Sequence, residues 1–424
     1  MLRFIHSHWK RLPHGLRRRA LFAVASRIAP RPALSDPPAA NPIVVAGFLG
    51  TASGIGESAR LCYDALTALG YDTRGVDLSG GLLRQDLNLP EYRFRCGRSA
   101  RDTGTMILHI NPPVISLALL SMGRSLVSRK RLIAYWAWEL PDIPVDWLPC
   151  LRFAHEIWVP SSFTAEVLSR VTDLPILVAP HPVRLPDLDG NVPEPLGLPA
   201  GVFVVLTMFN MSSGFTRKNP VAAVKAFRRA FGSDSTCMLI IKTSESDRYP
   251  QGMAELRAEI GQSANIRIID EAMPMAQRWA LIQRADVVLS LHRAEGFGLV
   301  LAEAMLIGKP VVATGWSGNM DFMNPDNSVP VPWEPVPCLD PQFTYHAPHL
   351  YWAEPSVEAA AEALQSLRTD SHYYRGIAQA ALANSRAAFG LERYREIVAP
   401  RLPSLEIALP RDTDAVSHAP LASE

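Results

Sequence analysis

Residues 286–314, DVVLSLHRAEGFGLVLAEAMLIGKPVVAT, follow the order strand, loop, helix, strand. The runs DVVLSL and PVVAT are short, apolar and rich in β-branched residues, as buried strands are. Between them GLVLAEAMLIG has helical length, and two glycines flank the phenylalanine just before it. Short buried strands that alternate with helices indicate a parallel, doubly wound sheet.

The same alternation fills two halves of the 424-residue chain. Six prolines between Pro180 and Pro199 separate the halves and mark a linker at residues 181–200. A chain of this length is too long for one ordinary core. We therefore predict an α/β protein with two Rossmann-like doubly wound domains, residues 41–180 and 201–370. Around them we expect a basic arm (1–40), C-terminal helices that pack back on the first domain (371–404) and a mobile tail (405–424).

Composition excludes several classes of protein. Apolar residues make up 48% and charged residues 20% of the chain, and no apolar run approaches the ~18 residues of a membrane span. The five cysteines are scattered, with no C-x-x-C pair and no histidine at metal spacing, so neither a disulfide framework nor a zinc site is indicated. These features favour a globular protein of the reducing cytoplasm.

Charge is distributed unevenly along the chain. Residues 1–32 contain eight lysines and arginines and no acid. Because the net charge of the whole chain is +1, the net charge of the remaining residues is −7. In LRRRALFAVASRI the arginines stand beside apolar residues, a combination that suits the anionic inner surface of a membrane. A disordered basic arm is the alternative.

The sharpest chemistry lies in the second half. Glu295 follows a predicted strand, where open α/β sheets bind their ligands, and Gly296 and Gly298 lead into a helix whose N-terminal N–H groups suit a phosphate. Glu303 lies one turn into this apolar helix, and a buried carboxylate there needs a hydrogen-bond partner such as a ribose diol. Arg217 and Lys218 follow the first strand of the same domain, suited to a diphosphate. Together these residues predict a site for a nucleoside diphosphate that carries a further group.

At these residues the sequence resembles the retaining GT-B glycosyltransferases of family four. The resemblance rests on E-x7-E around GFG, on RKN after the first strand of the second domain, and on GKPVVAT. In the first domain, GIGESA, HINPP, YWAWELPDIPVDWLP and HEIWVPSSF resemble bacterial members that build surface polysaccharides. It covers roughly residues 42–400 and implies two domains that face each other across a cleft.

The resemblance also implies roles for individual residues. Arg217 and Lys218 would hold the diphosphate and stabilise its departing charge, Glu295 would contact the hydroxyls of the donor hexose, and Glu303 would contact the ribose. Backbone contacts to phosphate and sugar would come from four consecutive residues: Gly296, Phe297, Gly298 and Leu299.

The acceptor side departs from the family pattern. Many relatives have a histidine in the first domain that faces the transferred sugar, whereas the comparable stretch here reads AYWAWE. Glu139, the acid at the end of this aromatic strand, and His109 in LHINPP are the two candidates to replace it, and for each of them a purely structural role remains an alternative.

The turn GIGESA raises a different hypothesis. Gly54 and Gly56 fit G-x-G-x-x-A, and Asp77 follows at the distance of a ribose-binding acid, as in nicotinamide-dependent oxidoreductases. However, FLGTAS separates the strand from Gly54, which favours an interdomain loop that faces the donor phosphates. Asp187 and Asp189 form a D-x-D pair, but they lie in the proline-rich linker without a strand to present them, so we expect no metal and no cofactor.

The sequence thus predicts a retaining, metal-independent hexosyltransferase of polysaccharide biosynthesis. Its donor would be a nucleoside-diphosphate sugar and its acceptor a saccharide or polyprenyl-linked saccharide, with no nucleic acid as partner. We expect it in the cytoplasm, with peripheral membrane contact through the basic arm. A Rossmann oxidoreductase and a non-catalytic sugar-nucleotide-binding subunit remain the alternatives.

Overall fold

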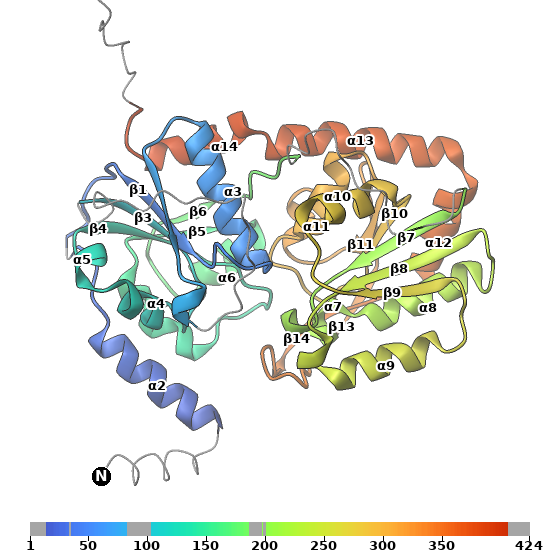
Figure 1. Ribbon diagram of the computed structural model, residues 1–424, viewed down its shortest axis with the longest axis horizontal. Coiled ribbons are helices and arrows are strands. Elements are labelled where there is room, and N and C mark those ends of the chain that lie inside the picture. Colours follow the sequence, from blue (N-terminus) through green and yellow to red (C-terminus); the bar gives the residue numbers. More distant parts are fainter. Residues whose placement is uncertain (1–13, 34, 83–102, 186–196, 198–200, 406–424) are drawn as a thin grey trace, which may run out of the picture.

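The computed structural model describes residues 14–33, 35–82, 103–185, 197 and 201–405. They form two α/β domains placed side by side, each built on a parallel sheet of six strands (Figure 1). The predicted fold class is confirmed. The predicted linker, residues 181–200, lies mostly outside the described residues, and so do the D-x-D pair and the tail from residue 406.

The first sheet has the order β2-β1-β3-β4-β5-β6, with all neighbours parallel. Alternate residues of β1 belong to different cores, since Ile43 and Val45 face one layer of helices whereas Val44 and Ala46 face the other. Burial of both faces explains why its strands are continuous apolar runs. The strands are β1 (Ile43–Gly47), β2 (Thr73–Asp77), β3 (Gly104–His109), β4 (Lys130–Tyr135), β5 (Glu156–Val159) and β6 (Ile176–Val178).

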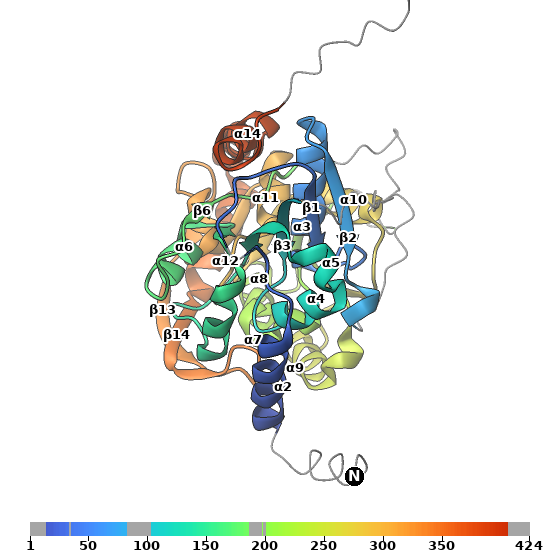
Figure 2. The same ribbon diagram turned by 90° about the vertical axis from the view of Figure 1, so that its left-hand side faces the viewer.

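Helices cover both faces of this sheet and extend beyond it. Residues 14–28 form α2, which projects from the body of the first domain (Figure 2) and packs against α4 and η3. The helical segments are α2 (His14–Ile28), α3 (Gly54–Ala68), η1 (Gly80–Leu82), α4 (Ile115–Met122), α5 (Arg124–Val127), η3 (Val145–Phe153) and α6 (Ser162–Ser169).

The second sheet has the order β12-β11-β10-β7-β8-β9. Its chain starts at β7, runs outward through β8 to β9, then returns to β10 on the other side of β7 and continues through β11 to β12. The loops after β7 and β10 therefore diverge from a shared edge, which is the place where such sheets bind ligands. The strands are β7 (Phe203–Met208), β8 (Cys237–Thr243), β9 (Ile266–Asp270), β10 (Val287–Ser290), β11 (Val311–Thr314) and β12 (Val329–Val331).

The helices of the second domain include the one that follows the GFG loop, α11. The set is η4 (Met211–Ser213), α7 (Phe215–Lys218), α8 (Pro220–Phe231), η5 (Ser246–Arg248), α9 (Pro250–Ile260), α10 (Met275–Arg284), α11 (Leu299–Leu306), η6 (Gly318–Asp321) and α12 (Val357–Thr369).

The strands β13 (Trp333–Cys338) and β14 (Ala347–Pro355) form an antiparallel hairpin that we did not predict from the sequence. Two prolines inside β13 hide it from a strand pattern, although proline is tolerated at a sheet edge. One face of the hairpin reaches the first domain, because Cys338, Tyr345 and Trp352 are buried in that domain's main core. The hairpin therefore belongs to the second domain in sequence and contributes to the packing of the first.

The C-terminal helices connect the two domains. The long helix α13 (Ser371–Phe389) runs along one side of the molecule, and after Gly390 the chain continues in α14 (Leu391–Val398) and η7 (Ala399–Arg401) (Figure 1). Tyr394 and Val398 lie in a core of the first domain, and the Tyr394 hydroxyl is 3.5 Å from Cys62 Sγ. The chain thus returns from the second domain to complete the first.

Candidate functional site

The candidate site starts from α7, one turn of helix that the loop after β7 places at the sheet edge. Arg217 is 3% exposed, and its guanidinium donates to the carbonyls of Ala294 (2.7 Å) and Ser213 (2.8 Å). One carbonyl belongs to the loop after β10 and the other to the loop after β7. Arg217 therefore joins the two loops that diverge at the centre of the sheet.

Lys218 and Glu295 form an ion pair at this edge, between Nζ and Oε1. The second carboxylate oxygen of Glu295 lies 3.5 Å from Arg217 Nη1. Burial alone raises the pKa of Glu295, but Lys218 and Arg217 outweigh it and hold the pKa at about 2. Glu295 is therefore ionised at neutral pH and shared between two cations.

Glu139 approaches this cluster from the first domain. Its Oε1 lies 3.9 Å from Arg217 Nη2, and Tyr345, whose ring is 5.1 Å from the Arg217 guanidinium, contacts both residues. Burial raises the pKa of Glu139, although Arg217 opposes the change. Four predicted residues from two domains thus form one charge cluster, which we call the central cluster: Glu139, Arg217, Lys218 and Glu295.

The loop 295–298 is held from both sides. Ser161 of the first domain donates its hydroxyl to the Gly296 carbonyl (2.7 Å), and Ser317 accepts a hydrogen bond from the Glu295 amide (2.8 Å). A Cβ on Gly318 would lie 2.2 Å from the Gly296 oxygen, so only glycine fits there. These contacts fix the backbone of the loop against both domains.

The remaining residues of the predicted donor loop have different surroundings. Gly298 has φ of +97° and precedes α11, a conformation that favours glycine. The Phe297 ring packs against His181 of the segment after β6 and against Phe322 and Phe389. Leu299 begins α11 and is half-buried. The side chain of Phe297 therefore serves the domain interface, while its backbone remains part of the loop.

Glu303 is separate from the central cluster. It is 2% exposed and pairs with Arg278 Nη1 of α10 at 2.6 Å, while Arg278 Nη2 lies 4.0 Å from Glu57 of α3. Burial raises the pKa of Glu303, which Arg278 counteracts. Arg278 therefore connects the carboxylate predicted for ribose to the first domain, a partner that its sequence context did not reveal.

The GIGESA turn opens α3 beside this charge pair. A Cβ at Gly56 would meet the Phe48 carbonyl at 2.5 Å, so this glycine allows close packing of the preceding loop, whereas Gly54 faces open space. Asp77 accepts hydrogen bonds from the Ser79 hydroxyl (2.6 Å) and the Gly50 amide (3.2 Å). Asp77 thus stabilises a loop, which does not favour the oxidoreductase hypothesis.

His109 does not reach the cluster. It is fully buried at the end of β3, with Nδ1 2.8 Å from the Ser58 hydroxyl and its ring stacked on Tyr135 at 4.4 Å. Burial holds the pKa of His109 well below its usual value, so the ring is neutral. His109 has no exposed surface, and its Nε2 has no hydrogen-bond partner among the described residues. Its acceptor-side role therefore stays a prediction beside the structural alternative.

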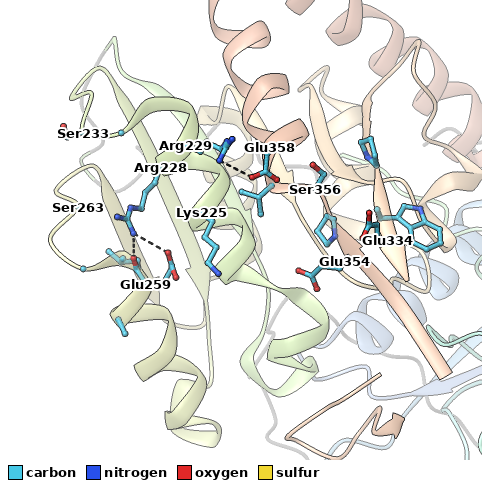
Figure 3. A pocket seen from close by; sticks show the side chains of 18 of the residues that line it. Lys225, Arg228, Arg229, Ser233, Glu259, Ser263, Glu334, Glu354, Ser356 and Glu358 are labelled. Atoms are coloured by element: carbon cyan, nitrogen blue, oxygen red, sulfur yellow. Dashed lines mark hydrogen bonds and ion pairs between the residues drawn. The ribbon is translucent and has the colours of Figure 1, made fainter. Parts of the chain in front are cut away.

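A groove lies elsewhere on the second domain, between α8, α9 and the hairpin (Figure 3). Its cations are partly matched by acids, with Arg228 3.4 Å from Glu259 and Arg229 3.1 Å from Glu358. It contains none of the predicted site residues. We call it the outer groove.

Part of the chain is similar in sequence to a known protein family. Residues 206–329, from β7 to β12, match the family described as "Glycosyl transferases group 1". A search of curated proteins found no match for the chain. In the described parts of the chain no three histidine, cysteine or acidic side chains cluster as they would around a metal ion.

Three solved structures illustrate the likeness in fold. HepE from Anabaena aligns at a TM-score of 0.60 with 15% identity, over 84% of this chain and 98% of its own. A glycosyltransferase from Rickettsia africae aligns at 0.55 with 15% identity over the same shares. A variant of TarM from S. aureus aligns at 0.51 with 12% identity, over 71% of this chain and 55% of the longer TarM chain.

These likenesses define the class of the molecule as a two-domain α/β protein of the GT-B type. The family match then covers part of the second domain, and three of the four residues of the central cluster, Arg217, Lys218 and Glu295, lie within the matched segment.

Proposed function

We propose that the protein transfers a hexose from a nucleoside-diphosphate sugar to a saccharide or lipid-linked saccharide, with retention at the anomeric carbon. The observation that carries the proposal is the central cluster: the buried Arg217 and the half-buried Lys218 meet the buried carboxylate of Glu295 where the loops after β7 and β10 diverge. Three of its four residues lie in the segment that matches the group 1 glycosyl transferases. We place the activity in the cytoplasm, in polysaccharide biosynthesis.

In this proposal the diphosphate binds Arg217 and Lys218. Arg217 is fixed by two carbonyls and Lys218 is held by Glu295, so both cations are in place before the donor arrives. When the bond to the sugar breaks, negative charge grows on the diphosphate, and preorganised buried cations stabilise that charge far better than water does. Glu295 then faces the hydroxyls of the transferred hexose and Glu139 faces the acceptor. No metal or cofactor takes part.

The nucleotide can be identified by thermal stability. At a hundredfold excess over Kd, a ligand that binds only the folded state stabilises it by about 2.7 kcal/mol. A panel of UDP, GDP, ADP and TDP with their sugars should yield at least one clear rise in Tm. UDP is the first choice because HepE was solved with UDP and glucose. NAD(H) and NADP(H) complete the panel, and a rise with these alone would favour the oxidoreductase alternative.

Replacement of Glu303 by glutamine should weaken binding of the matched nucleoside diphosphate by about 1–3 kcal/mol. The variant keeps one acceptor oxygen but loses the charge that a ribose diol would contact and that Arg278 now neutralises. Calorimetry with the ribonucleotide and with its 2′,3′-dideoxy analogue isolates this contact. The wild type should prefer the ribonucleotide, and the variant should lose most of that preference; an equal preference in both would remove Glu303 from the ribose site.

We further propose that α2 and η3 bring the enzyme to an anionic membrane. Leu21, Val24 and Ile28 recur on one face of α2 and are 46–64% exposed, whereas Ala25 is buried and Ala29, just after the helix, belongs to the core of the first domain. In η3, which contacts α2, Val145 is 80% exposed. The basic composition of residues 1–32 supplies the matching charge. None of the described helices is long and apolar enough to cross a bilayer.

Binding to vesicles checks this surface. The wild type should co-sediment with vesicles that contain phosphatidylglycerol at low salt, and Val145→Glu combined with Ile28→Glu should lower the bound fraction several-fold. Leu339→Glu, at a leucine that is 53% exposed on the hairpin, is the matched control. Transfer to a soluble acceptor should not change. Equal binding of both variants would reject the membrane surface.

A further inference from the structure

Four aromatic side chains meet where the first domain touches the second. Trp316, in the loop after β11, is the centre of the group: its ring lies 4.5 Å from Trp333, 5.6 Å from Tyr351 and 5.5 Å from Phe163, measured between centroids. Trp333 and Tyr351 come from the hairpin, and Phe163 comes from α6 of the first domain. We call these four residues the aromatic platform.

The aromatic platform is open to solvent in part. Tyr351 is 39% exposed and the other three rings are half-buried, although Phe, Trp and Tyr are costly to leave in water. Trp333 also lines the outer groove, so one edge of the platform adjoins a hollowed surface. A cluster that served only as core would bury these rings.

The polar atoms of the platform are unevenly satisfied. Trp333 donates its indole N–H to the Gly315 carbonyl at 2.9 Å. By contrast, the indole N–H of Trp316 is buried without a hydrogen-bond partner in the described part of the chain. Buried indole groups usually find a partner. Trp136, in the core of the first domain, is a second exception among the described residues, so the case for the platform rests on its exposure and its position.

Short connections join the platform to the donor loop from both sides. Ser317, next to Trp316, holds the Glu295 amide at 2.8 Å. Ser161, two residues before Phe163, holds the Gly296 carbonyl at 2.7 Å. The platform is therefore attached to the loop 295–298 near Glu295, which the proposed function assigns to the transferred hexose, and not to Glu303 in α11, which it assigns to ribose.

We propose that the aromatic platform binds pyranose units of the saccharide acceptor that lie beyond the unit to which the hexose is added. One face of a pyranose presents C–H groups with partial positive charge, and these pack on the negative faces of aromatic rings while the hydroxyls stay in water. A run of rings next to the reacting sugar suits consecutive units of a chain. This inference rests on the proposed function, since it assigns the acceptor side of the same site.

Binding of free oligosaccharides tests the platform without catalysis. Maltohexaose, cellohexaose and α-mannohexaose, each up to about 10 mM, are titrated against the nucleotide-free protein while tryptophan fluorescence and saturation-transfer NMR are recorded. We expect at least one hexaose to bind and the corresponding monosaccharide to bind at least fivefold more weakly. Tyr351→Ala should weaken the binding at least fivefold.

Phe343→Ala is the matched control, since Phe343 is a 73% exposed aromatic residue of the same hairpin whose ring contacts only His346 among the described ring pairs. It should bind the hexaose like the wild type. Trp333→Phe keeps an aromatic ring and should retain part of the affinity for the hexaose. This second variant keeps the test informative if Tyr351→Ala does not fold.

Two results would overturn the inference. One is that no hexaose binds; the other is that Tyr351→Ala and Phe343→Ala behave alike. Nucleoside-diphosphate affinity, measured by calorimetry in the same variants, should stay at the wild-type value. If no nucleotide binds even the wild type, the donor-site proposal fails by itself, because the hexaose titration contains no nucleotide.

Discussion

Lys218→Ala is expected to lower kcat/KM for sugar transfer by about 10²–10³-fold, the loss seen when one preorganised donor to a developing anion is removed. The lysine stands in the central cluster next to Arg217 and contacts Glu295. Without it the diphosphate loses a charge-assisted contact in the ground state and a stronger one as it departs. Steady-state transfer rates and calorimetric affinity for the nucleoside diphosphate should therefore both fall.

Lys225→Ala provides the control for Lys218→Ala. This lysine lies in the next helix, α8, is exposed, and lines the outer groove rather than the central cluster. Its removal changes the net charge by the same amount and should leave transfer within about twofold of the wild type. A similar loss in both variants would mean that the rate depends on overall charge and not on the proposed diphosphate contact.

Glu295→Gln should lower kcat by about 10–100-fold without weakening nucleoside-diphosphate binding. The carboxylate holds Lys218 in the free enzyme, so the diphosphate has to compete with it, and the neutral amide competes less. The proposed contact with hexose hydroxyls, by contrast, acts in the transition state and is lost with the charge. Calorimetry and transfer rates on one protein preparation separate the two effects. Lost nucleotide affinity with normal turnover would reverse the roles of Glu295 and Glu303.

The effect of Glu295→Gln on the folded protein can be measured by acid unfolding. The pKa of Glu295 is depressed to about 2 in the folded protein, against 4.5 when unperturbed. Ionised Glu295 therefore stabilises the fold fully above pH 4.5, and this contribution is lost as the pH falls towards 2. In the glutamine variant this part of the pH dependence should disappear, so its unfolding free energy should decline less steeply over that range.

The sequence was sufficient for the features that depend on local order. Strand-end positions placed Arg217, Lys218 and Glu295 at one sheet edge, since the ends of parallel strands meet there. The approach of Glu139 to Arg217 depends on how two domains dock, which no local pattern encodes. The pairing of Arg278 with Glu303 was equally hidden. In the sequence Arg278 has the pattern of a solvent-exposed position on a helix surface.

His109 shows a second limit. Both faces of the first sheet are covered by helices. The alternation of side chains along β3 therefore does not tell whether the residue at its end points toward a ligand or into a core. The structure turns it toward Ser58. The hairpin was missed for another reason. Pro335 and Pro337 interrupt the strand pattern of β13, whose partner strand β14 carries Tyr351 and Trp352.

The packing of α14 on the first domain determines where chimaeras of such proteins can be joined. Tyr394 and Val398 share a core with Ile43 and Val45, so the first domain is not complete at residue 180 but only when residues 391–402 are added. A chimaera that pairs this second domain with a foreign first domain should therefore be cut at the linker and again at Gly390, with the C-terminal segment taken from the parent of the first domain. In recombination the transferable first domain is thus discontinuous, because it comprises the segment before the linker together with residues 391–402.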